Sequence, residues 1–260
     1  MPDQPSHLDR VRDEFRRQAD TFDAHAVKAD LSVEDRFRQA LGHCAAGSIL
    51  DVACGPGVVT AAVAQDATAV VGLDATDAML TKARVRAQDL PHVSFQAGDA
   101  EALPFEDACF DGLVTRLSLH HFETPAKALS EMSRVLKPGG RAVIVDVTAD
   151  EDRAKADLQN AIEILRDPSH VRMMPAAEID GLITGSGFSI AASETWDKER
   201  EFEEWMGIVN DPKRLGPLRT VVRALAEENR DAGFNLRIDD GEIRFFHRWH
   251  LVAADKLASE

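Results

Sequence analysis

The feature that most constrains this chain is an apolar run that ends beside an acidic residue and leads through glycines into a second apolar run. The first run covers residues 48–52 and carries Asp51, and Gly55 and Gly57 precede the second run at Val58. Glycine leaves the backbone free of side-chain bulk, so such a loop lets main-chain N–H groups approach a ligand at a helix N-terminus. The segment predicts a buried strand, a ligand-binding turn and a helix.

A second strand-like run, residues 69–73, ends at Asp74. Its distance from Asp51 leaves room for one helix and a return strand. In nucleotide-binding α/β sheets, an acidic residue at the end of the second strand accepts hydrogen bonds from the ribose hydroxyls. A carboxylate has two oxygens for this task, and it would repel a 2′-phosphate. We therefore expect Asp74 to bind a ribose, the alternative being an exposed loop acid.

The glycine pattern departs from the form found in dinucleotide-binding proteins. Thr60 stands where G-x-G-x-x-G has its third glycine, and Asp51 would repel a pyrophosphate. A ligand with a cationic amino group fits better, and S-adenosylmethionine has an α-ammonium, a ribose and an adenine but no phosphate. An NAD-linked oxidoreductase remains one alternative. A protein that binds S-adenosylmethionine without catalysis is the other.

Five motifs, including the two already described, occur in order between residues 49 and 146. They are the glycine loop 51–57 and the runs 71–80, 95–105, 110–116 and 135–141. In combination they resemble the class I S-adenosylmethionine-dependent methyltransferases, in particular the small-molecule branch that includes the ubiquinone and menaquinone biosynthesis methyltransferases. The resemblance implies an α/β fold with a Rossmann-like sheet of seven strands, the last one antiparallel, and helical cap insertions.

The resemblance also implies a cofactor site along the strand ends. Asp51 would contact the methionine ammonium, Met79 would offer a polarisable thioether to the adenine, and Asp99 would accept the adenine amine. Core packing for Met79 and a helix N-cap for Asp99 are the alternatives. The full set of expected cofactor residues is Asp51, Ala53, Gly55, Gly57, Asp74, Ala75, Met79, Gly98, Asp99, Ala100, Arg116, Phe15 and Phe22.

Candidate catalytic residues follow the fourth predicted strand. Arg116 could reach a substrate carboxylate or phenolate, or pair with one of the many acids. Adjacent side chains point in different directions, so His120 and His121 should not chelate a metal together, and we expect no metal site. His121 is favoured as a general base because an unperturbed imidazole pKa of ~6.5 suits that role. His120, His170 and His25 remain candidates.

The organisation along the chain separates a polar N-terminal region from an alternating one. Residues 1–40 are predicted to form a helical lid, in which Phe15, Gln18 and Phe22 could face the cofactor; simple packing is the alternative. Alternating strands and helices indicate a parallel sheet. Predicted strands lie at 48–52, 69–73, 92–96, 110–115, 140–147, 188–195 and 244–253, with a turn at 138–140.

Two stretches of the methyltransferase domain, residues 41–260, exceed what the sheet needs. They lie at about 151–175 and 200–243 and should form substrate caps, the alternative being a larger core. Within the first, the polar segment 166–172 resembles one that faces the active site in this methyltransferase branch, which favours a contribution from His170.

Composition narrows the partners. The net charge of −15 opposes binding to nucleic acid or to anionic membranes. The N-terminus has no signal-peptide core, and no apolar run is long enough for an integral membrane segment, so we expect a cytoplasmic protein. No Asn/Asp-Pro-Pro-Tyr motif follows the fourth strand; residues 115–118 read Thr-Arg-Leu-Ser. The expected methyl acceptor is therefore an oxygen or activated carbon of a small molecule, and a homodimer stays open.

Overall fold

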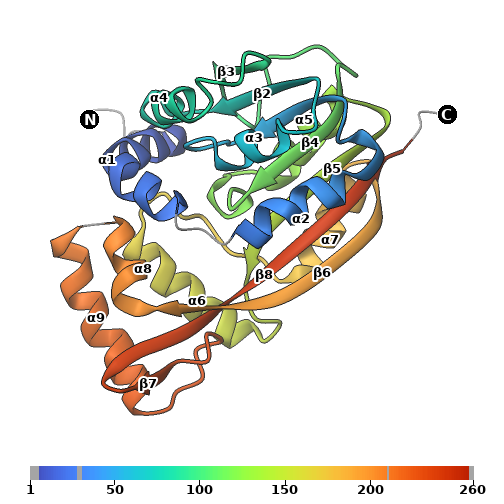
Figure 1. Cartoon of the computed structure of the whole chain (residues 1–260). Helices are drawn as coiled ribbons and strands as arrows, with labels where there is room; N and C mark the ends of the chain where they lie inside the picture. Colours follow the sequence, from blue (N-terminus) through green and yellow to red (C-terminus); the bar gives the residue numbers. More distant parts are fainter. Residues whose placement is uncertain (1–5, 28–30, 210, 258–260) are drawn as a thin grey trace.

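A mixed α/β architecture organises the chain (Figure 1). The computed structural model describes residues 6–27, 31–209 and 211–257, and no side chain between 25 and 34. The strands in this part are β1 (Ser48–Val52), β2 (Ala69–Asp74), β3 (Val93–Ala97), β4 (Phe110–Arg116), β5 (Leu136–Thr148), β6 (Phe188–Glu201), β7 (Arg237–Asp239) and β8 (Glu242–Lys256). The helices are α1 (His7–Val27), α2 (Leu31–Leu41), α3 (Val58–Val63), α4 (Asp77–Arg86), α5 (Pro125–Val135), α6 (Arg153–Arg166), α7 (Ala176–Gly185), α8 (Phe202–Val209) and α9 (Pro212–Glu227), with short 3₁₀ turns at Gly42–Cys44 and Leu119–His121.

The strands form one sheet in the order β3-β2-β1-β4-β5-β8-β6, and the short β7 pairs with β8 outside this path. The first five strands are parallel neighbours, and β8 runs antiparallel to both β5 and β6. The predicted Rossmann-like sheet with an antiparallel last strand is confirmed. The strand order reverses between β1 and β4, and ligands bind at such a switch point in open α/β sheets.

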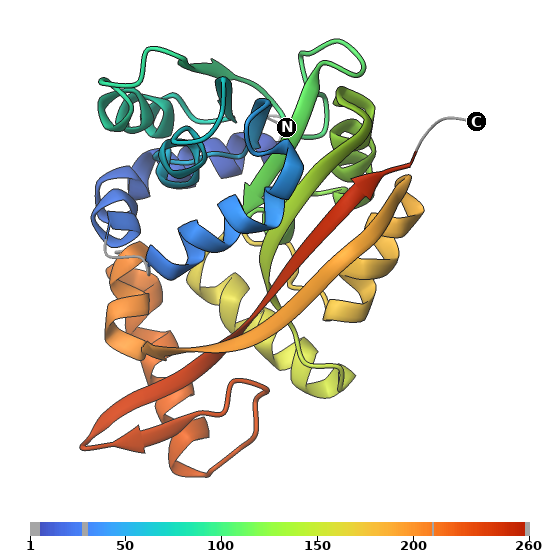
Figure 2. The ribbon, with the colours of Figure 1, turned by 45° about the vertical axis from the view of Figure 1, so that its right-hand side comes forward.

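Helices cover both faces of the sheet (Figure 2). Successive residues of β1 point to opposite faces, so Ile49 belongs to the core cluster that includes α2 and α3, whereas Leu50 belongs to the cluster with α5 and α7. Burial on both sides explains why the central strands read as continuous apolar runs. The glycine turn after β1 is thereby held at a rigid edge.

The predicted turn at 138–140 is wrong, because these residues belong to β5. The pairing with β4 shifts register between Phe110 and Gly112, and Gly139 has a φ of +75°. Glycine tolerates this left-handed conformation, so the strand continues through an irregularity instead of ending at a turn.

The N-terminal region divides into two helices with different roles. Helix α2 packs on α3 with Phe37 and Leu41 fully buried, so it is part of the core. Helix α1 instead lies across the carboxyl ends of the strands and contacts α4 and α8 (Figure 1). Of the residues 1–40 expected to form a lid, only those of α1 therefore remain candidates for that role.

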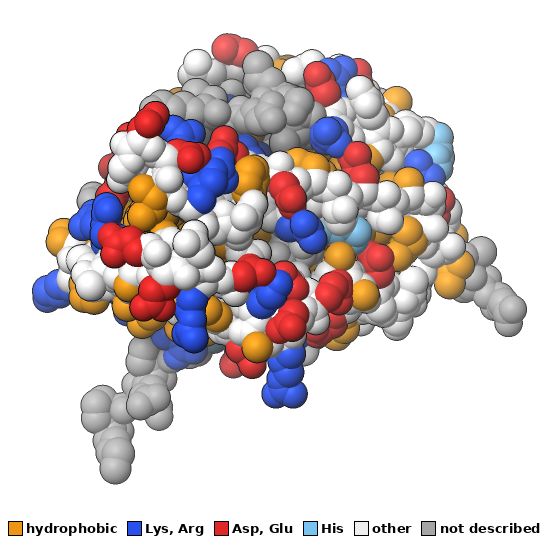
Figure 3. Space-filling model, turned by 90° about the horizontal axis from the view of Figure 1, so that it is seen from below, with side chains coloured by type: hydrophobic (Ala, Val, Ile, Leu, Met, Phe, Trp, Pro, Cys, Tyr) orange, Lys and Arg blue, Asp and Glu red, His pale blue; other side chains and the backbone are white. Residues whose placement is uncertain are grey.

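The two predicted insertions meet at one end of the molecule. Helices α6, α8 and α9 lie beside the extended halves of β6 and β8, where Trp205, Phe234 and Phe245 extend the core cluster that contains Ile49. On the face shown in Figure 3, basic and acidic side chains are intermixed and form no continuous basic patch. Among the described residues, every helix is too short or too polar to cross a membrane.

Candidate functional site

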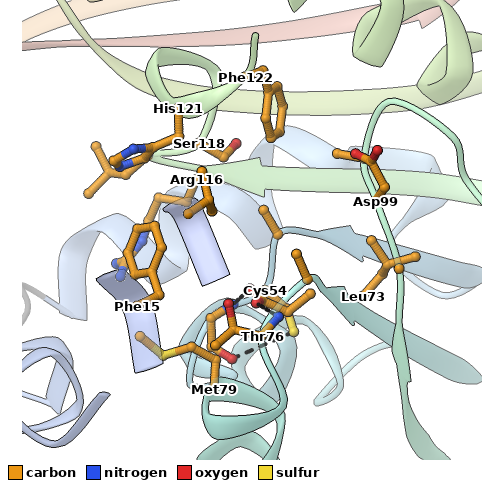
Figure 4. Close-up of a pocket in the computed structure, with 18 of the residues that line it drawn as sticks. Phe15, Cys54, Leu73, Thr76, Met79, Asp99, Arg116, Ser118, His121 and Phe122 are labelled. Carbon is orange, nitrogen blue, oxygen red and sulfur yellow. Dashed lines mark hydrogen bonds between the residues drawn. The ribbon is translucent and has the colours of Figure 1, made fainter. Parts of the chain in front are cut away.

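A cavity lies at the carboxyl ends of β1, β2 and β4, beneath α1 (Figure 4). Its volume is about 160 Å³, whereas a single water molecule needs only ~10–15 Å³, so a ligand of some size can enter. Thirteen of the residues expected at the site line this cavity: Phe15, Phe22, Asp51, Ala53, Gly55, Asp74, Ala75, Met79, Gly98, Asp99, Ala100, Arg116 and His121.

Gly57, which was expected at the cofactor site, does not line the cavity. A Cβ at Gly57 would lie 2.9 Å from the Cβ of Ala83, so this glycine permits close packing of α3 on α4. Gly55 is different: it also has a positive φ, but a Cβ there would meet only the Phe22 ring, at 4.0 Å. The backbone at Gly55 is therefore open toward the ligand space.

Asp51 is buried at the end of β1 and accepts a hydrogen bond from the Thr60 hydroxyl, with an O···O distance of 2.6 Å. Burial raises the pKa of Asp51 to about 7, although the hydrogen bond from Thr60 and the charge of Arg116 both lower it. The Thr60 hydroxyl thus binds the Asp51 carboxylate. The third glycine of the dinucleotide-binding pattern would instead allow a helix to pack closely at this position. A cationic ligand group would offset the cost of the buried charge.

Asp74 is held by the backbone on both oxygens. Its Oδ1 accepts from the Thr76 N–H at 2.8 Å and its Oδ2 from the Gly55 N–H at 2.9 Å. Burial raises the pKa of Asp74, and these hydrogen bonds oppose the effect. Each carboxylate oxygen keeps a second lone pair for a ligand hydroxyl.

Thr76 supplies a polar group that the sequence analysis did not identify. It precedes α4, where a threonine usually caps the helix, yet its side chain makes no capping bond. Among the described residues its buried Oγ1 makes no hydrogen bond of good geometry, although it lies near enough to Asp74 to help lower the pKa of that carboxyl. Buried hydroxyls are normally paired, so this atom fits a ligand hydroxyl beside Asp74.

The two ends of the cavity differ in character (Figure 4). Leu73 and Asp99 lie at one end, and Met79 lies below with its side chain almost fully buried. Asp99 Oδ1 accepts from the Glu101 N–H at 2.9 Å, which closes a turn and does not cap a helix. Phe15 and His121 lie at the opposite end.

The histidine end is enclosed by aromatic rings from α1. Phe15 meets Phe22 and His121 edge-on, with ring centroids 5.9 and 5.1 Å apart. His7, which the sequence analysis missed, donates from Nε2 to the His121 carbonyl at 2.7 Å. His7 and Phe15 are eight residues apart on one helix face, so the apolar stripe extended toward the N-terminus could have revealed it.

His121 is the one histidine of the adjacent pair that faces the cavity. Its Nδ1 lies 3.0 Å from the Ser169 carbonyl oxygen. Burial and the neighbouring His120 charge lower the pKa of His121 to about 4, with Asp167 opposing them. A neutral imidazole is therefore the form present near pH 7.

His120 does not line the cavity, so its expected catalytic role has no support from its placement. Its Nδ1 lies 2.5 Å from Asp146 Oδ1. Burial lowers the pKa of His120, but the charge and hydrogen bond of Asp146, with the charges of Glu163 and Asp167, together leave the pKa raised. His170 Nε2 contacts Asn160 Oδ1 at 3.0 Å, and burial lowers its pKa to about 3. The side chain of His25 lies outside the described residues.

Comparison with known proteins identifies the family. Residues 50–144 match the profile described as "Methyltransferase domain". The uncharacterised methyltransferase YcgJ of Bacillus subtilis is 34% identical over 160 residues, which are 61% of this chain and 63% of that protein. The uncharacterised protein YafE of Escherichia coli is 34% identical over 154 residues, 58% of this chain and 74% of YafE. The ubiquinone/menaquinone C-methyltransferase UbiE of Geobacter sulfurreducens is 32% identical over 155 residues, 56% of this chain and 60% of UbiE.

Solved structures agree with the sequence matches. The YcgJ crystal structure superposes with a TM-score of 0.81 at 28% identity, covering 88% of this chain and all of that one. A candidate methyltransferase from Bacillus halodurans has a TM-score of 0.80 at 30% identity. The superposition covers 87% of this chain and all of that one. This chain therefore belongs to the class I methyltransferases, which use S-adenosylmethionine as methyl donor. The sequence match spans just under two thirds of YcgJ, so the acceptor is not fixed by the family.

Proposed function

We propose that this protein transfers a methyl group from S-adenosylmethionine to an oxygen or activated carbon of a small, partly apolar molecule. The supporting observation is the continuity of one cavity: it runs from two buried carboxylates, Asp51 and Asp74, to an end bounded by Phe15 and His121. One end suits a cationic nucleoside and the other an acceptor. The cofactor supplies an electrophilic methyl group with a neutral leaving group, so the protein mainly has to align and desolvate the reactants.

The cofactor would be held by complementary charge and hydrogen bonding. Asp51 would pair with the α-ammonium, directly or through an intermediate group. Asp74 would accept the ribose hydroxyls with Thr76 Oγ1 as a third partner, since that hydroxyl makes no hydrogen bond of good geometry among the described residues. Met79 would pack on the adenine face and Asp99 would accept the adenine amine.

The acceptor end combines apolar walls with a base and a cation. Leu8, Val11 and Phe15 of α1 line the cavity together with Arg116 and His121. Arg116 would stabilise negative charge on the acceptor, and neutral His121 would take its proton. A base whose conjugate acid has a low pKa deprotonates an acidic hydroxyl, such as a phenol or enol, more readily than an alcohol.

Both rival functions make different predictions. The NAD-linked oxidoreductase is disfavoured by the family and by Asp51, whose carboxylate lies at the end of β1 just before the glycine turn, where it would repel a pyrophosphate. A binding protein without catalysis would keep the cofactor site but transfer no methyl group. The relatives named as ubiquinone/menaquinone biosynthesis C-methyltransferases support transfer to carbon over oxygen.

The N-terminal helix α1 would act as a lid, because it covers the cavity and is held there by side-chain contacts with the strand-end loops and with α4. Arg12 Nε donates to the Ala75 carbonyl at 3.2 Å, and Arg86 pairs with Asp23 at 2.5 Å. No described residue of the segments 151–175 and 200–243 lines the cavity, which supports the alternative that these insertions enlarge the core. The cytoplasmic location and a homodimer stay predictions, the latter testable by light scattering.

The test has two stages. Calorimetry with S-adenosylmethionine and with NAD should give binding of the first alone. Incubation with methyl-labelled cofactor and a panel of phenols, enols and hydroxyquinones should then place label on at least one member, identified by mass spectrometry. Binding of NAD in preference would refute the cofactor assignment, and binding of the cofactor without any labelled product from the panel or a metabolite extract would favour the non-catalytic alternative.

A further inference from the structure

The loop after α6 places a hydroxyl between the cavity histidine and a buried carboxylate. Ser169 Oγ lies 3.2 Å from His121 Nδ1 and donates to Asp167 Oδ1 at 2.5 Å. Ser169 is fully buried and Asp167 is 4% exposed. The three side chains thus form a continuous hydrogen-bonded row that leads away from the cavity.

The row determines which nitrogen of His121 carries the proton. A carbonyl oxygen only accepts hydrogen bonds, and the Ser169 carbonyl lies 3.0 Å from Nδ1. The Ser169 hydroxyl gives its hydrogen to Asp167, so its oxygen also faces Nδ1 as an acceptor. Nδ1 must therefore bear the hydrogen, and Nε2 is left with the lone pair.

Asp167 is fixed in position and stays ionised. Its Oδ1 also accepts from the Ser169 N–H at 2.9 Å, and its Oδ2 lies 3.5 Å from Gln18 Nε2 of α1. Burial raises the pKa of Asp167, but the charges of His121 and Arg166 and the hydrogen bonds from Ser169 leave it lowered overall. A permanent negative charge therefore stands behind the histidine ring.

Other titratable and charged groups surround His121 and are not part of the hydrogen-bonded row through Ser169 and Asp167. His7 of α1 contacts its carbonyl, and Arg116 of β4 shares the cavity. The His120–Asp146 pair lies on one side, with ring centroids of His120 and His121 4.2 Å apart. His170 lies 6.2 Å away, centroid to centroid. Glu123 also lines the cavity.

We propose that Ser169 and Asp167 are positioning residues for His121: they hold its ring as the Nδ1–H tautomer, direct the Nε2 lone pair to the acceptor, and stabilise the imidazolium formed after proton transfer. The proposal rests on the proposed methyl transfer. In that reaction the acceptor's O–H or C–H bond breaks, its electron pair bonds the transferred methyl carbon, and its proton moves to Nε2 and later to solvent. The electron pair of the broken carbon–sulfur bond stays on sulfur.

The test is a nuclear magnetic resonance titration of ¹⁵N-histidine-labelled protein, free and with S-adenosylhomocysteine. His121 should be a single Nδ1–H tautomer near pH 7. At the acid end of the titration, Asp167→Asn should lower the protonated fraction of His121 about tenfold, the effect of removing one close charge. Ser169→Ala should cause a smaller fall and leave the tautomer in place, because the carbonyl remains.

Asp180→Asn is the matched control, since Asp180 faces His250 Nε2 at 2.8 Å and neither residue lines the cavity. It should leave the His121 signals unchanged. An Nε2–H tautomer in the unaltered protein would overturn the proposal, as would an unchanged protonated fraction in both variants. If Asp167→Asn does not fold, Ser169→Ala alone decides. Calorimetry with S-adenosylhomocysteine separates the two hypotheses, because loss of cofactor binding refutes the proposed function and leaves the tautomer result intact.

Discussion

At the residue scale, Asp74 carries a clear prediction for cofactor binding. Asp74→Ala should weaken S-adenosylmethionine binding by ~1–3 kcal/mol, the cost of losing hydrogen bonds to a charged group. Isothermal titration calorimetry measures the difference. Asp74→Asn should lose less, because an amide oxygen still accepts from the Gly55 or Thr76 N–H.

Asp77→Ala provides the control for Asp74, since Asp77 is exposed in the first turn of α4. It should leave the affinity within experimental error. A folded Asp74→Ala protein with unchanged affinity would remove Asp74 from the ribose site.

The ionised Asp51 carboxylate should lower the stability of the fold and strengthen cofactor binding. Its folded pKa is about 7, above the ordinary 3.8, so the buried group favours the protonated form and its ionisation destabilises the fold as pH rises through that range. Asp51→Asn keeps an acceptor for Thr60 without the charge. At pH 8 we expect a melting temperature a few degrees higher, the shift that about 1 kcal/mol causes in a chain of this size, together with weaker cofactor binding.

The same comparison at pH 5 is the internal control for Asp51. There the native carboxyl is already protonated, so Asp51→Asn and the unaltered protein should melt at similar temperatures in differential scanning fluorimetry. A stabilisation of equal size at both values would show that charge is not the cause.

At the element scale, α1 should control how tightly the site closes. Phe15→Ala removes the ring that meets both Phe22 and His121, and we expect roughly tenfold weaker binding of S-adenosylhomocysteine, about 1.4 kcal/mol. Faster tryptic cleavage within α1 in the complex should accompany it. Asp13→Ala, an exposed change on the same helix that removes no trypsin site, should alter neither measurement. Equal protection of α1 in the Phe15→Ala complex would argue against the lid.

The elements also show where sequence reasoning succeeds and where it ends. Strand positions from β1 to β5 follow from apolar runs and punctuating glycines, and parallel pairing then brings Asp51 and Asp74 to one edge without further information. The strand β7 has only three residues, too few for any periodicity. Helix α2 is polar except for a few positions such as Phe37 and Leu41, so its role in the core shows only after folding.

The candidate site divides in the same way. Residues that follow a strand directly were predictable, because the strand fixes where they lie. Ser169 lies 48 positions from His121 in sequence, and no local pattern reports such a contact. Thr76 was hidden for another reason: a threonine before a helix reads as a cap, and only the structure shows that its hydroxyl makes no capping bond.

At the scale of the whole molecule, buried histidines should set the response to acid. The pKa of His121 is lowered to about 4 and that of His170 to about 3, and burial also lowers the pKa of His247. Unfolded histidine titrates near ~6.5, so between pH 6.5 and 4 the unfolded chain binds more protons at these positions and stability falls as pH falls. His120, Asp51 and Asp74, whose pKa values are raised, oppose part of this.

His170→Gln tests that balance, because a glutamine amide can still donate to Asn160 Oδ1. The urea midpoint of this variant should fall less between pH 7.5 and pH 5 than that of the unaltered protein. His43→Gln changes an exposed histidine and should keep the original slope. Parallel slopes for all three proteins would contradict the role assigned to buried histidine.

The lengths of β6 and β8 have a consequence for which part of this protein can move. With 14 and 15 residues, each extends roughly 45–50 Å at ~3.3 Å per residue, and together they form both the far border of the sheet and the platform beneath α6, α8 and α9. A hinge motion between this platform and the rest of the sheet would have to break the main-chain hydrogen bonds that join β6 and β8. We therefore expect this part of the molecule to stay fixed relative to the sheet during turnover, with the N-terminal helix alone providing entry and exit.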